Sequence, residues 1–135
     1  MIFNAIRDAT SEDLPAIAAI QGPSGWEPKS YLSYTCRVFV NEGKINGFLV
    51  SRETGPGERE ILNLAVDLAQ RRHGVGRKLM EEELQRPAKR WFLEVRESNQ
   101  AAINLYWSVG FRPAGRRADY YSDPPESAIV MRFLS

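Results

Sequence analysis

The sequence predicts a single α/β (α+β) domain over residues 1–135, with a mixed, mostly antiparallel sheet and helices on both of its faces. Three observations support this fold class. Apolar runs of strand length are interspersed with segments of helical periodicity, turns rich in glycine and proline separate them, and 135 residues suit one core. The 43% hydrophobic and 26% charged content argues against a disordered chain.

The N-terminal quarter predicts a strand followed by helices. Residues 2–9 alternate loosely and are typical of a strand, and the capping residues of segment 10–13 precede a helical pattern over 14–20. The glycines and proline of segment 22–25 end that helix. Residues 26–32 predict a short second helix.

Three neighbouring antiparallel strands are expected next. Residues 37–40 and 45–50 flank the compact polar turn 41–44, which is typical of a hairpin. A second turn over 53–58 leads into a strand at 60–66.

The middle of the chain predicts a strand, a helix and another strand. A basic loop with glycines leads into a helix over 76–85, which Pro87 breaks. The run 91–95 is apolar enough to be covered on both faces, as central parallel strands are. This succession implies a right-handed crossover.

The C-terminal third predicts one helix and two strands. Residues 101–107 form a short helix with Gly110 as its left-handed stop. One strand begins at Phe111, another covers 128–134, and segment 118–125 joins them.

The charge and cysteine content exclude several classes of protein. Eighteen Lys and Arg against seventeen Asp and Glu leave a net charge of +1, so no strong field favours nucleic acid or an anionic membrane. The lone Cys36 excludes an internal disulfide, and no apolar run reaches membrane-spanning length. We therefore expect a cytoplasmic protein without a direct nucleic-acid or membrane partner, and a monomer or weak homodimer.

A candidate anion site lies between the strand at 60–66 and the following helix. Its segment 71–78, of sequence RRHGVGRK, combines two glycines, basic side chains and the positive end of a helix, which suits a pyrophosphate. The spacing fits neither the nucleotide-binding P-loop nor the dinucleotide fingerprint. Taken alone, the glycines are equally compatible with an ordinary turn.

The chain resembles the GNAT superfamily of acetyl-CoA-dependent N-acetyltransferases. Arg71, Gly74 and Gly76 match its glycine-loop signature, and residues 93–111, of sequence LEVRESNQAAINLYWSVGF, look like the same stretch of bacterial ribosomal-protein-alanine N-acetyltransferases. The resemblance covers essentially the whole chain. It departs at residues 67–70, where relatives place a proline and an aromatic residue, and at the short connection 86–89.

The resemblance implies two catalytic residues, and no cluster of His and Cys residues suggests a metal site. Glu94 matches the general base, acting directly or through water, and Tyr106 matches the acid that protonates the CoA thiolate. A carboxylate within an apolar run has its charged form disfavoured, which favours proton uptake. The structural alternatives are a Glu94 paired with Arg96 or a neighbouring arginine, and a Tyr106 that is a core aromatic.

Acetyl-CoA is the cosubstrate that the resemblance implies. Backbone groups of residues 64–66 are expected to contact the pantetheine, with one N–H stabilising the oxyanion. Asn99 is either a further contact or the N-cap of a helix. The expected cosubstrate-binding residues are Leu64, Ala65, Val66, Arg71, Arg72, His73, Gly74, Val75, Gly76, Arg77 and Asn99.

The expected acceptor-binding residues are Trp26, Asn63, Tyr120 and Tyr121, because aromatic side chains and an amide suit an extended peptide. The aromatic members are nearly as well explained as loop anchors. The predicted acceptor is the N-terminal α-amine of a protein such as a ribosomal protein. The alternatives are a small-molecule amine as acceptor, or a noncatalytic acetyl-CoA-binding module.

Overall fold

The computed structural model describes residues 4–22, 27–70 and 74–134. Its strands are β1 (Asn4–Asp8), β2 (Thr35–Asn41), β3 (Lys44–Gly55), β4 (Glu58–Val66), β5 (Arg90–Arg96), β6 (Arg112–Ser122) and β7 (Pro125–Leu134). Its α-helices are α1 (Leu14–Gln21), α2 (Val75–Glu83) and α3 (Gln100–Ser108). Short 3₁₀ turns are η1 (Ser11–Asp13), η2 (Pro28–Ser33) and η3 (Leu68–Gln70).

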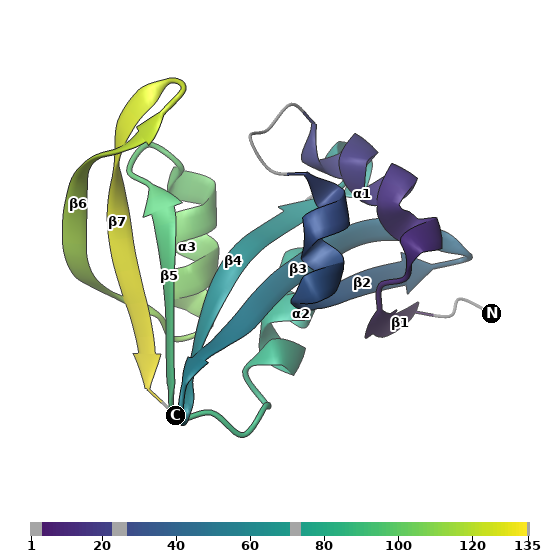
Figure 1. Ribbon diagram of the computed structural model, residues 1–135, viewed down its shortest axis with the longest axis horizontal. Coiled ribbons are helices and arrows are strands. Elements are labelled where there is room, and N and C mark those ends of the chain that lie inside the picture. Colours follow the sequence, from purple (N-terminus) through teal and green to yellow (C-terminus); the bar gives the residue numbers. More distant parts are fainter. Residues whose placement is uncertain (1–3, 23–26, 71–73, 135) are drawn as a thin grey trace. The chain divides into compact units, whose positions relative to one another are not determined.

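Within these ranges the strands form a seven-stranded sheet of order β1-β2-β3-β4-β5-β7-β6 (Figure 1). β4 pairs with β5 in parallel, whereas β1 with β2, β2 with β3, β5 with β7, and β6 with β7 are antiparallel. The predicted mixed, mostly antiparallel sheet is confirmed.

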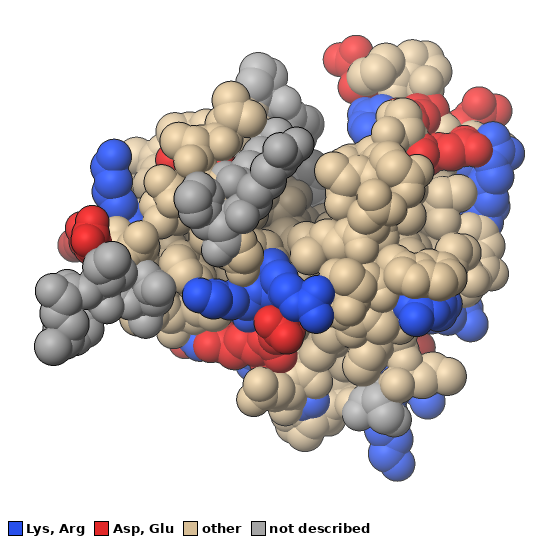
Figure 2. All heavy atoms as spheres, turned by 180° about the vertical axis from the view of Figure 1, so that it is seen from behind, with Lys and Arg blue, Asp and Glu red and all other residues tan. Residues whose placement is uncertain are grey.

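The chain divides into two compact units. Unit 1 consists of Met1–Arg52 and Leu62–Glu83, and unit 2 of Glu53–Ile61 and Leu84–Ser135. On the face shown in Figure 2, Lys and Arg side chains are interspersed with Asp and Glu, in keeping with the net charge of +1. None of the helices in the described ranges is long and apolar enough to cross a membrane.

In unit 1, the two faces of the β2–β3 hairpin carry different helices. Val38 is aligned with Phe48, and both belong to a buried cluster that includes Ile17 of α1 and Tyr31 of η2. On the opposite face, Phe39 is aligned with Gly47, against which α2 packs. Alternation along each strand therefore sends successive side chains to different helices. Both faces are covered, as the sequence predicts.

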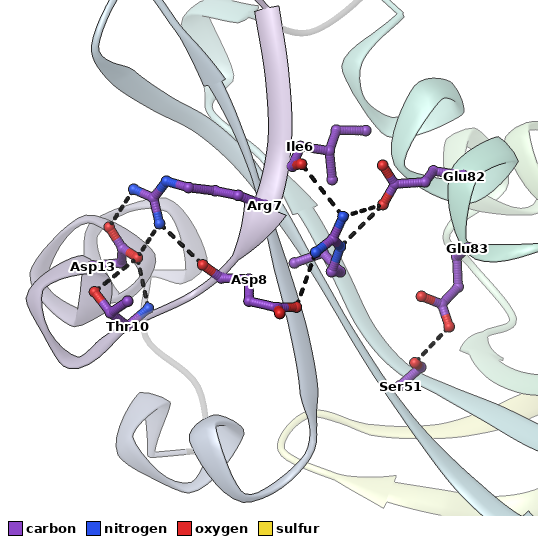
Figure 3. Close-up of polar contacts among 9 residues, drawn as sticks. Ile6, Arg7, Asp8, Thr10, Asp13, Ser51, Glu82 and Glu83 are labelled. Atoms are coloured by element: carbon purple, nitrogen blue, oxygen red, sulfur yellow. Dashed lines mark hydrogen bonds and ion pairs between the residues drawn. The ribbon is translucent and has the colours of Figure 1, made fainter. Parts of the chain in front are cut away.

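The start of unit 1 has the helix-capping contacts that its sequence predicts. The carboxylate of Asp13 accepts a hydrogen bond from the Thr10 backbone N–H at 2.7 Å and closes the predicted capping arrangement. It also accepts two bonds from the Arg7 guanidinium at 2.8 and 3.0 Å (Figure 3). The hydrogen bond from Arg7, more than any other contact, lowers the pKa of Asp13 to about 2.

The expected helix over 26–32 is instead the 3₁₀ turn η2, and residues 23–26 lie outside the described ranges.

Asp13→Asn is expected to lower the free energy of unfolding at pH 7 by on the order of 1–2 kcal/mol. The folded-state pKa of about 2 lies below the ordinary aspartate value of 3.8, so this stability is present above about pH 4 and is lost as the pH falls toward 2. Urea unfolding of wild type and variant at pH 7 and between pH 5 and pH 2 measures it. The exposed Glu12→Gln is the control, and an equal pH dependence in wild type and D13N would contradict the assignment.

In unit 2, the two faces of β5 differ in burial. Trp91, Leu93 and Val95 are buried, while the side chains between them are partly exposed. Residues 91–95 are therefore fully buried on one face and only partly buried on the other, where the sequence analysis expects both faces to be covered. The parallel ladder recorded within unit 2 aligns Glu58–Ile61 with Arg90–Leu93, and β7 lies antiparallel on the other edge of β5.

Two further boundaries differ from the sequence prediction. The helix expected over 76–85 covers Val75–Glu83. Segment 118–125, expected to join the last two strands, is largely strand, because β6 runs to Ser122 and β7 starts at Pro125. The polar residues of this segment do not alternate with apolar ones, so the sequence does not indicate a strand. Pairing with β7 makes the segment part of a strand. Gly110, which follows the C-cap residue Val109 of α3, has a φ of +114°, as predicted.

Candidate active site

The start of α2 supplies the candidate anion site of unit 1. Gly74 is exposed with a φ of +79°, and its carbonyl accepts a hydrogen bond from the Lys78 N–H at 3.0 Å. The N–H groups in the first turn of a helix lack partners within that helix and form its positive end. Val75 and Gly76 in this turn are buried, and Arg77 is exposed. The predicted residues Arg71, Arg72 and His73 lie outside the described ranges.

Packing against β3 and β4 fixes the first turn of α2. A Cβ atom at Gly47 would lie 2.9 Å from Val75 Cγ1, 3.0 Å from the Ala65 carbonyl oxygen and 3.4 Å from Leu79 Cδ1. Only a residue without a side chain permits this approach. Gly47 therefore sets the distance between α2 and these strands.

Polar contacts hold the last turn of α2 (Figure 3). Arg37 of β2 pairs with Glu82 at 2.9 Å, and the Ser51 hydroxyl of β3 donates to the buried Glu83 carboxylate at 2.7 Å. Both ends of the helix are thus attached to the hairpin. The sequence analysis did not identify these residues, because their partners are far apart along the chain.

Gly47→Ala is expected to destabilise unit 1 by about 1–3 kcal/mol, because the added methyl group overpacks the contact with Val75 and the Ala65 carbonyl. Urea unfolding measures the change. Gly55→Ala is the matched control on the same strand, since a Cβ there would meet nothing within 4 Å. Equal stability of the two variants would contradict the tight packing.

The end of β4 carries the residues predicted to face the thioester. Leu64, Ala65 and Val66 are partly buried. The next residue, Asp67, donates its N–H to the Asn46 carbonyl at 2.8 Å, and its own carbonyl accepts from Gln70 at 2.8 Å. Segment 67–70, where the sequence departs from its relatives, thus forms the ordered turn η3.

Asn63 belongs to a polar network with α1 and η2. Its amide Nδ2 donates to the Tyr31 hydroxyl at 3.0 Å and to Gln21 Oε1 at 3.4 Å, and the Tyr31 hydroxyl also donates to Gln21. Tyr31 is fully buried, and this burial raises its pKa. Asn63 therefore links β4 to η2 and α1, and its contact with a peptide stays a prediction. Tyr31 and Gln21 carried no sequence signal, and Trp26 lies outside the described ranges.

Glu94 occupies the partly exposed face of β5. Its side chain is 10% exposed, and Arg117 Nε of β6 lies 3.7 Å from its Oε2. Oε2 is buried and accepts no hydrogen bond from the described residues. The structural alternative of a neighbouring arginine is thus partly realised, with Arg117 as the partner. Arg96 instead pairs with Glu126 at 3.3 Å.

Tyr106 is the buried residue of α3. It is 7% exposed, and its ring lies 6.1 Å from the ring of Phe111. Burial, with a smaller contribution from the nearby Tyr121, raises the pKa of Tyr106 well above the ordinary value. The phenol is therefore protonated at neutral pH and can act as a hydrogen donor.

Asn99 caps α3. Its Oδ1 accepts a hydrogen bond from the Ala102 N–H at 3.2 Å, which is the N-cap role that the sequence left open. The side chain is exposed. Its contact with a cosubstrate stays a prediction.

Tyr120 and Tyr121 lie in β6 rather than in a loop. Their rings form an edge-to-face pair with centroids 5.0 Å apart. Arg117 lies 5.6 Å from the Tyr120 ring centroid and Arg96 lies 4.3 Å from that of Tyr121. Burial, then Tyr120 and Glu94, raise the pKa of Tyr121 to about 12. Tyr120 remains 48% exposed and is available for a ligand.

Taken separately, the two units offer different chemistry. Unit 1 presents a fixed helix start suited to a phosphate, and unit 2 presents a carboxylate and a protonated phenol suited to proton transfer. Among residues 4–22, 27–70 and 74–134, no group of three or more His, Cys, Asp or Glu is arranged to hold a metal ion.

Comparison with known proteins identifies relatives along nearly the full chain. A model of the acetyltransferase (GNAT) family matches residues 3–111. The ribosomal protein bS18-alanine N-acetyltransferase of Escherichia coli (strain K12) is 35% identical over 143 aligned residues, which cover 96% of each protein.

Solved structures agree with this match. The crystal structure of the ribosomal-protein-S18-alanine N-acetyltransferase from Escherichia coli has a TM-score of 0.85 at 34% identity, covering 98% of this chain and 94% of that one. Ard1 from Thermoplasma volcanium has a TM-score of 0.86 at 27% identity, with 97% of both chains covered.

Proposed function

The chain belongs to the GNAT family of N-acetyltransferases, and we propose that it transfers an acetyl group from acetyl-CoA to the N-terminal α-amine of a protein. The observation that carries the acceptor class is the 35% identity across 96% of both chains to an enzyme named for the N-terminal alanine of ribosomal protein bS18. The corresponding acceptor here is a ribosomal protein N-terminus.

Unit 1 is proposed to bind the cosubstrate. The first turn of α2, with Gly74, Val75, Gly76 and Arg77, receives the pyrophosphate of acetyl-CoA through backbone N–H groups. The preceding Arg71, Arg72 and His73 are proposed to bind the cosubstrate as well. Backbone groups of Leu64, Ala65 and Val66 contact the pantetheine and supply the oxyanion donor, and Asn99 of unit 2 adds a further contact.

Unit 2 is proposed to carry the proton transfers. As the amine attacks the thioester carbonyl, the new N–C bond forms and Glu94 takes the proton released by nitrogen, directly or through water. When the C–S bond breaks, the Tyr106 hydroxyl donates a hydrogen bond to the departing sulfur, which leaves as the thiolate and takes its proton from solvent. A reference α-amine pKa of roughly 8 makes this acceptor easier to deprotonate than lysine, near 10.4.

The acceptor peptide is proposed to contact Trp26, Asn63, Tyr120 and Tyr121. The exposed Tyr120 ring supports this assignment in unit 2. In unit 1, Asn63 has its amide nitrogen directed to Tyr31 and Gln21, so a peptide would engage its remaining hydrogen-bonding capacity. We further propose that both units form one catalytic domain over residues 1–135, acting in the cytoplasm as a monomer or weak homodimer.

Mass spectrometry tests the acceptor. The protein is incubated with acetyl-CoA and a peptide that starts with alanine and contains one internal lysine, and the modified nitrogen is located by fragmentation. We expect acetylation of the α-amine. A peptide with a blocked N-terminus and a panel of small amines serve as controls, and modification confined to lysine or to a small amine would reject the proposal. Cofactor binding without turnover on any amine would indicate a noncatalytic module.

A further inference from the structure

Arg117 and Glu94 meet across an intervening strand. Glu94 of β5 is aligned with Val130 of β7, which is aligned with Gly115 of β6, and Arg117 follows two residues later. Because side chains two residues apart share a face of a strand, Arg117 projects to the same face as Glu94. It is aligned with Ala128, whose small side chain leaves room for the guanidinium to reach the carboxylate.

The pair is unequal in burial. The Glu94 side chain is 10% exposed, and that of Arg117 is 59% exposed. Burying a carboxylate is unfavourable unless a partner compensates its charge. Arg117 supplies that positive charge from the solvent side. Because its guanidinium stays largely exposed, it keeps most of its own hydration.

The separation between the two groups leaves the carboxylate oxygen accessible to a proton. At 3.7 Å, Arg117 Nε attracts Glu94 Oε2 but is beyond hydrogen-bond distance. No described residue donates a hydrogen bond to Oε2. The buried oxygen therefore has a neighbouring positive charge and retains its capacity to accept a proton.

The other charged and titratable groups around Glu94 do not replace Arg117. Burial raises the pKa of both Tyr120 and Tyr121, and the nearby Glu94 adds to each rise. Glu60 of β4 adds further to the rise at Tyr120. None of these groups supplies a positive charge to Glu94. Arg96 is bound by Glu126 and by the backbone carbonyls of Asp123 and Pro124.

We propose that Arg117 is a positioning residue for acetyl transfer, which orients the buried Glu94 carboxylate while the amine delivers its proton to Oε2. This inference rests on the proposed role of Glu94 as general base. The proton passes from the attacking nitrogen to Glu94, directly or through one water, and Arg117 keeps its own protons throughout.

Arg117→Ala is expected to lower kcat/KM for the peptide about tenfold and to change KM for acetyl-CoA less than about twofold. Arg117→Lys restores most of the rate. Arg116→Ala is the matched control, because Arg116 is 54% exposed on the same strand and pairs with Glu97 instead.

Measuring Glu94→Gln alongside the Arg117 variants separates the role of Glu94 as general base from the positioning role of Arg117. Low turnover in E94Q together with a wild-type rate in R117A would overturn the role of Arg117 alone. Wild-type turnover in E94Q would reject the general base, and the inference about Arg117 with it. Circular dichroism checks that each variant folds, and Arg117→Gln is the second neutral variant if alanine unfolds the protein.

Discussion

Glu94→Gln is expected to lower kcat/KM for an N-terminal peptide by roughly 10² to 10⁴ at neutral pH, the range typical of losing a principal general base. The amide has nearly the same shape but cannot take up a proton. An α-amine of reference pKa near 8 loses its proton unaided at high pH, so the deficit should shrink between about pH 7 and pH 9. Initial rates across this pH range, monitored through the release of free CoA, measure the loss at neutral pH and its decrease at higher pH.

Glu97→Gln is the control for this variant. Glu97 directly follows β5, is exposed and pairs with Arg116 at 3.1 Å, so its loss removes a surface ion pair of little consequence. We expect wild-type kinetics. A folded E94Q protein with unchanged rates at every pH would remove Glu94 from the mechanism.

Tyr106→Phe is expected to lower kcat by roughly 10² to 10³, because it removes the hydrogen-bond donor to the departing thiolate. Its raised pKa keeps the hydroxyl protonated throughout the neutral range, so donor availability does not limit the rate there. Complete transfer to a thiolate, whose conjugate thiol has a reference pKa near 8.5, would run uphill. The physical contribution is therefore a hydrogen bond that strengthens as charge develops on sulfur.

Phenylalanine preserves the packing of Tyr106 against Phe111, so the variant tests the hydroxyl rather than the core. Single-turnover measurements of CoA release, with the KM for each substrate, locate the loss. The partly exposed Tyr34→Phe in unit 1 is the control. Equal single-turnover rates in wild type and Y106F would assign Tyr106 to the core alone.

Several features of the fold follow from short stretches of sequence. The hairpin turn has positive φ at Glu42 (52°) and Gly43 (78°), as the polar turn 41–44 predicts. The bond between Thr10 and Asp13 and the glycine that ends α3 are likewise local. Each of these features depends on a few consecutive residues, so it can be predicted from the sequence alone.

The bounds of β6 and β7 could not be predicted from the sequence in this way. β6 has the sequence RPAGRRADYYS, whose exposed polar residues show no alternation, and its ladder with β7 defines it as a strand. Tyr120 and Tyr121 were consequently expected in a loop. Hydrogen bonds between distant segments, rather than local preference, determine such strands.

The sequence by itself determined the type of protein: the order of its elements and the glycine loop before α2 follow from residues near one another in the chain, and the resemblance of residues 93–111 to the GNAT family supplied the candidates Glu94 and Tyr106. Only the tertiary structure decided what surrounds these groups. It placed Arg117 beside Glu94, Tyr31 against Asn63, and Gly47 beneath α2, because strand pairing and packing join residues that the sequence separates. Charge compensation, burial and close approach are properties of those contacts, and they determine how a carboxylate or a phenol can react.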